Sequence, residues 1–573
     1  MKIRYWTASA IALLSLSACG GRTGGVGSTP APTPAPSSTP TPTNATLTDL
    51  KYSQSFSNDA AYLKGTWDKT TGTAIDGQAE AGSLNIDYDA KTSSYTVSSA
   101  SRSLSFASAD ISSQDLDETV YKKTSGSQTD YLTLVSRPYS GGNAKQYVGM
   151  GYWQHNMTEG SNQSVEFASF TYGLPTQAAA VPRNGTAAYG IDVFGLVSMP
   201  GEEPLSFQGA GQFSVDFLQG IFDAQAYVTE YGLVTDFSAM GGGIEFRAGG
   251  SLSAIDGSFS GNAVYGSWNG QSSGSIAGRF FGPNGEELGA TFATGNDYGM
   301  AAVGSLVGSK DASLKPVNQT LTAMTQEQLF YYTGEGVNGS LRWLNSETFD
   351  INMPSSDMVG GRFTINDKIA SADPNFTAYA KSGDNGYGEQ QVTLELYKPG
   401  AANSEVQMTY ASFGHWTGTY GGPVSDYYFT YGFKTGDNYL AARTGKASYE
   451  GIAYGTGVNA DASAKYDVTG NSAFSVDFSR QAFTGTLALK GTEQVTKALA
   501  DFGVFNIDGA LIARNSILEG GIDRDGYYGG SFWGQFYGHN AEELAGTFWV
   551  LTRAGQGDPL EVGIRGATVA KAR

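Results

Sequence analysis

The sequence predicts an all-β protein made of two homologous lobes, and three observations support this fold class. Apolar residues alternate with polar ones in many short runs, such as 84–88, 131–135 and 392–396. The chain holds 78 glycines, 33 tyrosines and 30 phenylalanines but only 16% charged residues, which suits short strands and tight turns. The segment GRFFGPNGEELGATF at 278–292 returns as GQFYGHNAEELAGTF at 534–548. The chain is therefore an internal duplication.

The first 18 residues have the features of a secretory signal peptide. Lys2 and Arg4 precede an apolar run at 10–16 that is too short to span a membrane. Residues 16–19 (LSAC) resemble the bacterial lipobox, which predicts cleavage before Cys19 and lipidation of that cysteine. Cys19 is the only cysteine, so it has no disulfide partner; the alternative is a secreted protein with a free thiol. No Asp follows at position 20, which favours the outer membrane.

Residues 19–47 form a tether after the lipidated cysteine. They are rich in Gly, Ser and Thr, with prolines at 30, 32, 34, 36, 40 and 42. Such a segment cannot bury a core, and polyproline II extends by about 3.1 Å per residue. About 25 residues could therefore hold the folded part about 70 to 80 Å from the membrane.

Several further repeats fix the boundaries of the lobes. FSVDF occurs at 213–217 and 474–478, and FTYG at 170–173 and 429–432, with an offset near 260. We expect each lobe to be an irregular sheet domain followed by a compact antiparallel barrel, because closure removes unpaired strand edges. The predicted domains are 48–205 and 206–308 in the N-lobe, a linker at 309–320, and 321–466 and 467–573 in the C-lobe. Candidate short helices are 115–121, 325–329 and 495–501.

Each copy of the repeated segment carries two adjacent acids, Glu286 with Glu287 and Glu542 with Glu543. Paired carboxylates can serve acid/base catalysis or calcium binding. Adjacent residues on a strand point to opposite faces, however, so these pairs do not converge on one substrate or ion. We expect a structural hairpin, whose motif residues in the two lobes are Gly282, Asn284, Glu286, Glu287, Gly538, Asn540, Glu542 and Glu543.

The chain has three histidines, at 155, 415 and 539. His155 lies two residues after Trp153 and His415 lies beside Trp416, so these two are weak candidates for haem ligands. The alternative is ordinary packing at a strand end. The spacing of His, Cys and acidic residues matches no zinc site, and no metal is expected.

Charge and motifs exclude several classes of function. The net charge of −19 disfavours nucleic acid and anionic lipid surfaces and favours a basic or neutral partner. The only cysteine is assigned to lipid and no phosphate-binding glycine loop precedes a helix, so we expect no enzyme activity. Tyrosine pairs at 331–332, 427–428 and 527–528 are candidates for an interface, although most tyrosines in a β-rich protein cover strand faces.

The duplicated hairpin, with an upstream Gly-x-Ala-x-Tyr segment behind a lipobox and tether, resembles the transferrin-binding protein B family of surface lipoproteins. The resemblance implies a handle domain and an eight-stranded barrel in each lobe. It also implies an outer-membrane protein, exposed at the cell surface, that captures an iron carrier for a TonB-dependent transporter. The family's binding loops carry no motif that can be placed on this sequence, so no binding residue follows from the resemblance.

The leading hypothesis is therefore a lipid-anchored binding protein for an iron carrier protein or haem. The alternative is an adhesive or host-factor-binding lipoprotein on the same scaffold. A membrane-spanning barrel is a poorer interpretation, because few runs reach the 9 to 11 residues that such strands need.

Overall fold

The computed structural model describes residues 43–573, apart from 140–143, 242, 335, 353–360, 385–388, 421–424, 437–438, 441–442, 513–515, 525 and 553–560. The signal segment, Cys19 and the tether up to residue 42 lie outside the described residues. Regular structure in the described residues is almost entirely strand, with four short 3₁₀ turns. The predicted all-β class is confirmed. None of the helical segments in this part of the chain has the length and apolar character needed to cross a membrane.

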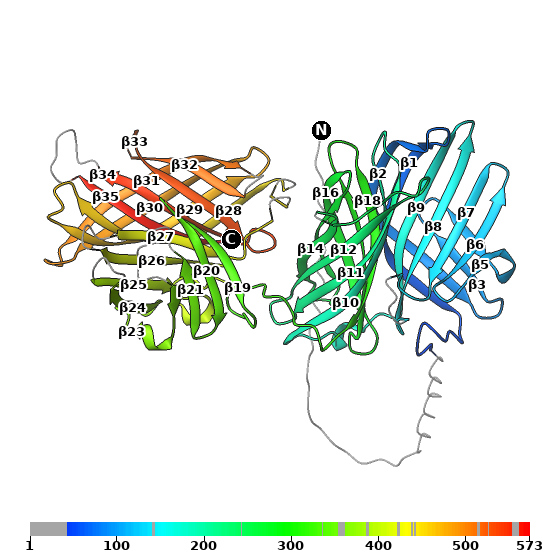
Figure 1. Cartoon of the computed structure of the whole chain (residues 1–573), viewed down its shortest axis with the longest axis horizontal. Coiled ribbons are helices and arrows are strands. Elements are labelled where there is room, and N and C mark those ends of the chain that lie inside the picture. Colours follow the sequence, from blue (N-terminus) through cyan, green and yellow to red (C-terminus); the bar gives the residue numbers. More distant parts are fainter. Residues whose placement is uncertain are drawn as a thin grey trace, which may run out of the picture. The chain divides into compact units, whose positions relative to one another are not determined.

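The N-lobe begins with a nine-stranded antiparallel sheet, the N-lobe handle (Figure 1, blue to cyan). Its strands are β1 (Gln54–Asp68), β2 (Thr73–Asp89), β3 (Ser94–Ser98), β4 (Ser103–Phe106), β5 (Ile111–Gln114), β6 (Glu118–Ser125), β7 (Gln128–Val135), β8 (Val148–Glu159) and β9 (Asn162–Gly173). Their order across the sheet is β4-β3-β2-β1-β9-β8-β7-β6-β5.

The handle sheet is rolled, and a short connection shows why. β4 and β5 lie at opposite edges of the sheet but are joined only by the 3₁₀ turn η1 (Ser108–Asp110). Four residues between Phe106 and Ile111 cannot span a flat nine-stranded sheet, so the sheet curves until its edges come near each other. The Asp110 carboxylate caps this turn by accepting the N–H of Ala107 at 2.8 Å.

The second part of the N-lobe is a closed barrel of eight strands (Figure 1, green). They are β10 (Thr186–Ser198), β11 (Leu205–Asp216), β12 (Ile221–Gly232), β14 (Glu245–Leu252), β15 (Phe259–Ser267), β16 (Gly270–Phe281), β17 (Glu287–Gly295) and β18 (Ala301–Lys310). β13 (Ser238–Ala239) is a short extra strand beside β12. β10 pairs with both β11 and β18, and β11 pairs with β12, which closes the ring.

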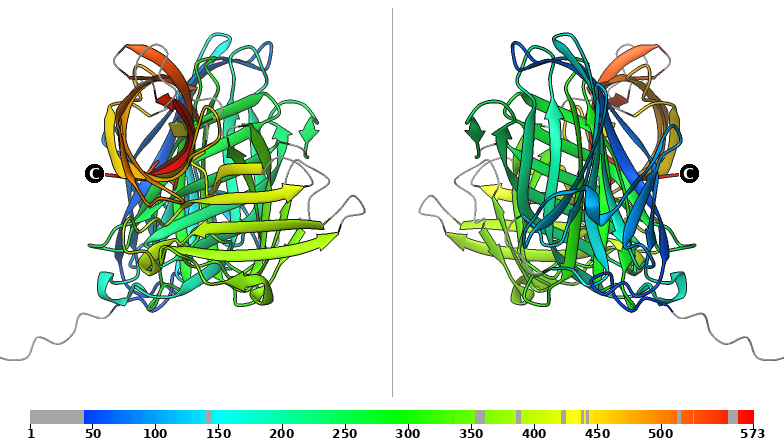
Figure 2. Two further views of the ribbon diagram at one scale, coloured as in Figure 1. Left: turned by 90° about the vertical axis from the view of Figure 1, so that its left-hand side faces the viewer. Right: turned by 90° about the vertical axis from the view of Figure 1, so that its right-hand side faces the viewer.

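The C-lobe repeats this plan. Its handle has the order β22-β21-β20-β19-β27-β26-β25-β24-β23, and its barrel closes from β28 to β35; Figure 2 shows this barrel as a ring of strands. The handle strands are β19 (Gln328–Gly334), β20 (Val337–Asn345), β21 (Thr348–Asn352), β22 (Gly361–Phe363), β23 (Lys368–Ile369), β24 (Phe376–Asp384), β25 (Glu389–Tyr397), β26 (Ala411–Tyr420) and β27 (Ser425–Gly432). The barrel strands are β28 (Lys446–Asn459), β29 (Lys465–Asp477), β30 (Ala482–Glu493), β31 (Leu499–Ile512), β32 (Ile517–Arg524), β33 (Tyr527–Tyr537), β34 (Glu543–Thr552) and β35 (Val562–Ala572).

Aromatic side chains fill both barrels, which are packed interiors rather than pores. In the N-lobe barrel the rings of Phe213 and Phe222 stack with centroids 5.0 Å apart, and Tyr189 is fully buried. In the C-lobe barrel the rings of Phe474 and Phe532 lie 5.2 Å apart. An eight-stranded barrel is narrow enough for its own side chains to fill, and buried apolar side chains form the core of each barrel here.

Two expectations about element boundaries are wrong. The barrels begin at Thr186 and Lys446, one strand earlier than the predicted boundaries at 205/206 and 466/467, because β10 and β28 close their rings. Each handle is a nine-stranded sheet with irregular register, with shifts at Thr66/Trp67 in the N-lobe and Trp343/Asn345 in the C-lobe. The candidate helices at 115–121, 325–329 and 495–501 are turns that lead into β6, β19 and β31, since sheet pairing outweighs weak helix propensity there.

Candidate functional site

One end of the N-lobe barrel exposes a group of apolar side chains. The connections 233–244, 268–269 and 296–300 follow β12, β15 and β17, so all three lie at the same end of the barrel. They carry Leu233, Val234, Met240, Trp268 and Tyr298, which we call the rim surface. Their exposed fractions include 76% for Met240, 66% for Trp268 and 81% for Tyr298. Large apolar side chains gathered in solvent at one place mark an interaction site.

Two carboxylates hold the connections of the rim surface in place. Glu230 is fully buried and accepts the hydroxyl of Tyr265 at 2.8 Å and the backbone N–H of Trp268 at 2.9 Å. Glu203 accepts the backbone N–H groups of Val234 and Thr235. These bonds fix the backbone under the apolar side chains, so the surface is presented without a large loss of entropy on binding.

An amide side chain orders the third connection. The Asn296 oxygen accepts the N–H groups of Tyr298 at 3.0 Å and Met300 at 3.1 Å, and its amide nitrogen donates to the carbonyl of Gln271 at 2.9 Å. The turn that carries the exposed ring of Tyr298 is therefore held by three hydrogen bonds of the Asn296 side chain.

Handle turns adjoin the rim surface. Ala74 bridges to Pro200, and its N–H donates to the carbonyl of Glu202 at 2.9 Å. A Cβ placed on Gly72 would lie 3.0 Å from the Val234 side chain. Exposed acids lie on the same connections or on the neighbouring β10–β11 turn, namely Glu202, Asp236 and Asp297. A partner with basic groups around an apolar centre would complement this end of the lobe.

The corresponding connection in the C-lobe barrel differs. It joins β30 to β31 and carries the aliphatic residues Val495 and Leu499, each 86% exposed. Glu493 holds it by accepting the N–H groups of Val495 and Thr496, much as Glu230 holds Trp268. In each lobe a glutamate therefore holds this connection, which is shorter in the C-lobe (494–498) than in the N-lobe (233–244).

The repeated hairpin motif is structural in both lobes. Glu286 accepts the backbone N–H of Asn284 at 2.8 Å and its side-chain amide at 2.9 Å, which closes the turn between β16 and β17. Glu542 does the same for Asn540, at 2.8 and 3.1 Å. Gly282 and Gly538 have positive φ of 87° and 89°, where an L side chain is strained.

The second glutamate of each pair joins the barrel to the handle. The buried Glu287 carboxylate accepts the backbone N–H groups of Gln146, Tyr147 and Val148 at 2.7, 2.8 and 3.1 Å. Glu543 likewise accepts those of Thr409, Tyr410 and Ala411 at 2.6, 2.8 and 2.9 Å. Burial raises the pKa of Glu543, and the three N–H groups oppose that rise. These oxygens are occupied, so they do not converge with Glu286 and Glu542 on a ligand.

The two haem candidates do not occupy equivalent positions. Gly151 pairs with Phe170 as Gly414 pairs with Phe429, which aligns His415 with Tyr152 and Trp416 with Trp153. His155 therefore has a different place in its handle. Its Nδ1 lies 3.1 Å from both carboxylate oxygens of Asp130.

His415 is held by two carboxylates and stacks on an aromatic ring. Its Nδ1 lies 3.3 Å from Glu395, its Nε2 lies 3.0 Å from Asp426, and its ring is 4.2 Å from that of Tyr428. Burial lowers the pKa of His415, but the bonds to Asp426 and Glu395 outweigh it and raise the pKa to about 9. A protonated imidazole has no lone pair for iron, so this site does not suit haem.

The tyrosine pairs divide between core and surface. Tyr332 and Tyr428 are buried, whereas Tyr331 is 69% exposed. The side chains of Tyr527 and Tyr528 lie outside the described part of the chain. Within the described ranges, no three His, Cys, Asp or Glu residues are grouped to hold a metal ion.

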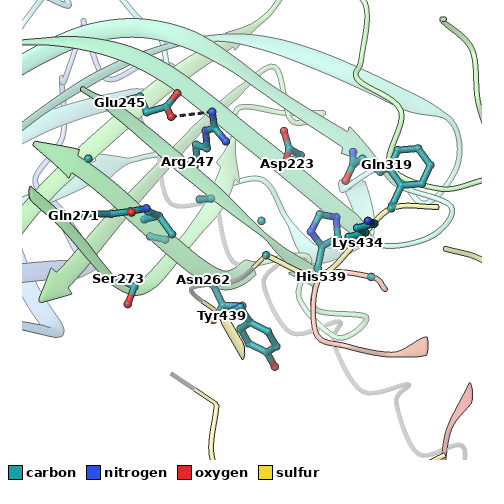
Figure 3. A pocket seen from close by; sticks show the side chains of 18 of the residues that line it. Asp223, Glu245, Arg247, Asn262, Gln271, Ser273, Gln319, Lys434, Tyr439 and His539 are labelled. Carbon is teal, nitrogen blue, oxygen red and sulfur yellow. Dashed lines mark ion pairs between the residues drawn. The ribbon is translucent and has the colours of Figure 1, made fainter. Parts of the chain in front are cut away.

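A cavity of about 940 Å³ lies between the outer wall of the N-lobe barrel and the C-lobe (Figure 3). One wall comes from β12, β14, β15 and β16, and includes Asp223, Arg247 and Asn262. The opposite wall includes Tyr439 and the third histidine, His539, whose burial lowers its pKa. Sequence patterns could not reveal this cavity, because lining residues such as Asp223 and His539 lie more than 300 residues apart in the chain.

Comparisons with known proteins agree with the resemblance. A family model described as the C-lobe and N-lobe beta barrels of Tf-binding protein B matches residues 442–568, which span the C-lobe barrel, and this family is not one of enzymes. Transferrin-binding protein B of Moraxella catarrhalis is 27% identical over 315 residues, which cover 48% of this chain. The match covers only 39% of that relative's length. The predicted resemblance to this family is confirmed.

Two solved structures are also similar. A double mutant of transferrin-binding protein B from Haemophilus parasuis Hp5 is 15% identical, with a TM-score of 0.26, and the alignment covers 89% of this chain and 95% of that one. The isotype 1 protein from serogroup B Neisseria meningitidis is 19% identical, with a TM-score of 0.25, covering 76% and 87%.

Proposed function

We propose that this chain is a surface lipoprotein that captures an iron carrier protein of the transferrin class through the rim surface of its N-lobe. The exposed aromatic and aliphatic side chains of that surface are the observation that carries the proposal. The relative from Moraxella catarrhalis is named for binding transferrin, which supports this class of partner.

The chemistry of the rim surface fits a protein partner. Tryptophan and tyrosine supply most binding energy at protein interfaces, because they bury a large area with few rotatable bonds. Trp268 and Tyr298 stand on turns that Glu230 and Asn296 already hold. The surrounding acids would speed association with a basic surface and make it sensitive to salt.

The test is a binding titration of residues 20–573, which lack only the signal segment and the lipidated cysteine. Truncation at an interface hot spot costs about 2 kcal/mol, so Trp268→Ala and Tyr298→Ala should each weaken transferrin binding about 30-fold. Trp533→Ala and Tyr331→Ala are the matched controls, because both rings are partly exposed in the C-lobe. Equal affinity of the rim and control variants would show that capture occurs elsewhere.

We also propose that this chain is anchored to the outer membrane and takes part in iron transport. Lipid on Cys19 anchors it to the outer membrane, and the captured iron passes to a TonB-dependent transporter. Metabolic labelling with palmitate should mark the wild-type chain but not Cys19→Ser. Protease shaving of intact cells should release fragments if the lobes face outward, and their full protection would refute a surface position.

Haem and adhesion are the other candidate tasks. His415 is held protonated, which makes haem a less suitable ligand than a carrier protein. An adhesive role would use the same exposed surface on another host protein. Expression repressed by iron would support iron capture, whereas constitutive expression with loss of attachment on deletion would support adhesion.

A further inference from the structure

The cavity of Figure 3 contains a buried acceptor that no described residue satisfies. Gln319 is only 7% exposed, and its Nε2 donates to the carbonyl of Ser214 at 3.3 Å. Its Oε1 is buried and has no hydrogen-bond partner among the described residues. A buried acceptor without a donor is costly, so a ligand or water that brings a donor would be stabilised here.

A second acceptor lies in the same cavity. The Asp223 carboxylate projects from β12 and accepts no hydrogen bond from the residues that the structure describes; Figure 3 places it on the same side of the cavity as Gln319. Burial raises the pKa of Asp223 to about 6, and Arg247 opposes that rise. At neutral pH this carboxylate is mostly ionised and can accept hydrogen bonds from a ligand.

The charges that line the cavity cancel. Arg247 lies in an ion pair with Glu245, with Nη2 and Oε1 2.8 Å apart. Asp223 and Lys434 add one charge of each sign. A strongly charged ligand would therefore gain little electrostatic binding energy, and the walls favour a neutral ligand.

Neutral polar groups and aromatic rings complete the walls. Asn262, Gln271 and Ser273 project from neighbouring strands β15 and β16, and Tyr439 and Tyr331 line the C-lobe side. Gly249 and Gly274 also line the barrel wall, and His539 packs over Gly249. Amide and carboxylate groups can form hydrogen bonds with the hydroxyl groups of a ligand, and aromatic rings can pack against its C–H groups. This combination suits a polyhydroxylated molecule.

We propose that this cavity binds a small neutral polyhydroxylated solute of the oligosaccharide class, with Asp223 and Gln319 accepting hydrogen bonds from its hydroxyl groups. A volume of about 940 Å³ lies within the range of small-molecule sites, about 300 to 1,000 Å³. This site shares no residue with the rim surface and does not depend on capture of an iron carrier.

The test uses residues 20–573 with three probes, which are maltotriose, lactose and N-acetyllactosamine. Saturation-transfer NMR should show transfer to ring protons of at least one sugar, and calorimetry should give its Kd. Asp223→Asn, which keeps the shape but removes the charge, should weaken binding about tenfold. Asp508→Asn, at an exposed acid of the C-lobe barrel, is the matched control and should leave the affinity unchanged. Binding by wild type should weaken below pH 6, as Asp223 becomes protonated.

Three results would overturn the proposal. They are no saturation transfer to any probe at about 10 mM, equal affinity of wild type and Asp223→Asn, and a crystal structure soaked with the sugars in which only water meets Gln319 Oε1. If Asp223→Asn alters the circular dichroism spectrum, Asn262→Leu replaces it, because that variant changes a different strand, β15, of the same wall. Failure of transferrin capture would leave sugar binding intact, so the two proposals fail separately.

Discussion

At the scale of single residues, neighbouring acids have separate tasks. Glu542 closes its own turn, whereas Glu543 reaches 132 to 134 residues back along the chain to three backbone N–H groups of the handle. The sequence predicted that the two side chains point to opposite faces, because adjacent residues on a strand do so. It could not predict the partner, since nothing in the local pattern identifies β26 as the neighbour.

Removing the charge of Glu543 should destabilise the C-lobe. Glu543→Gln keeps one acceptor but turns an N–H donor toward backbone N–H groups, so we expect a loss of about 2 to 4 kcal/mol in the free energy of unfolding. Glu542→Gln should cost less, because its bonds lie in a partly exposed turn. Urea denaturation of both variants checks this prediction, and equal losses would contradict the junction role.

His415 should make the stability of the C-lobe depend on pH. Its pKa is raised from 6.5 to about 9 in the folded state, so the stabilisation is fully present below pH 6.5 and is lost as the pH rises through about 9. The shift corresponds to at most about 3 kcal/mol. Melting temperatures between pH 6 and 9.5 should fall more for wild type than for His415→Gln. Parallel curves would refute the contribution of the charged ring.

At the scale of elements, a glycine and an aromatic ring recur across the same strand pair in both handles. A Cβ on Gly151 would lie 2.4 Å from the Phe170 ring, and one on Gly414 would lie 2.3 Å from that of Phe429. Real Cβ atoms do not approach so closely, so both rings need a glycine beneath them. The duplicated sequence contains both pairs, but only the register shows that they face each other.

Adding a methyl group at this contact should destabilise the handle. Gly414→Ala should cost about 1 to 3 kcal/mol, because the Phe429 ring must move in a packed core. Gly190→Ala on β10 is the control, since its only neighbour within 4 Å is Leu314 at 3.8 Å. Thermal unfolding measures both variants. A loss at Gly190 as large as at Gly414 would show that strand propensity, not the ring contact, sets the cost.

At the scale of the whole molecule, the duplication preserved the scaffold and changed its surface. Both lobes keep a nine-stranded handle, an eight-stranded barrel and the glutamate junction. The aromatic rim residues Trp268 and Tyr298 stand on the N-lobe. The proposed capture surface is therefore on the N-lobe.

This division predicts the behaviour of the C-lobe alone. Residues 321–573 contain complete handle and barrel cores, so they should unfold cooperatively as a separate unit. They should not retain a transferrin-class protein on a column, whereas residues 20–573 should. Calorimetry checks the first expectation and the column the second; capture by the C-lobe fragment would place the binding site outside the rim surface.

The sequence by itself determined the fold class, the duplication and the hairpin at each Glu-Glu pair. These features rest on alternation over a few residues and on repeated strings, both of which are local signals. The family resemblance added the eight-stranded barrels, which the structure confirms. The barrel boundaries could not be predicted from loop lengths and strand patterns along the chain, because β10 joins its barrel by pairing with β18, more than 100 residues away.

Only the tertiary structure decided which side chains meet. It placed carboxylates against His155 and His415, gathered the exposed residues of three connections into the rim surface, and set Gln319 and Asp223 in one cavity. Hydrogen-bond partners, burial and pKa depend on contacts between distant segments, and no spacing in the sequence encodes them. Local periodicity therefore fixes the strands, and the long-range pairing of those strands creates the sites.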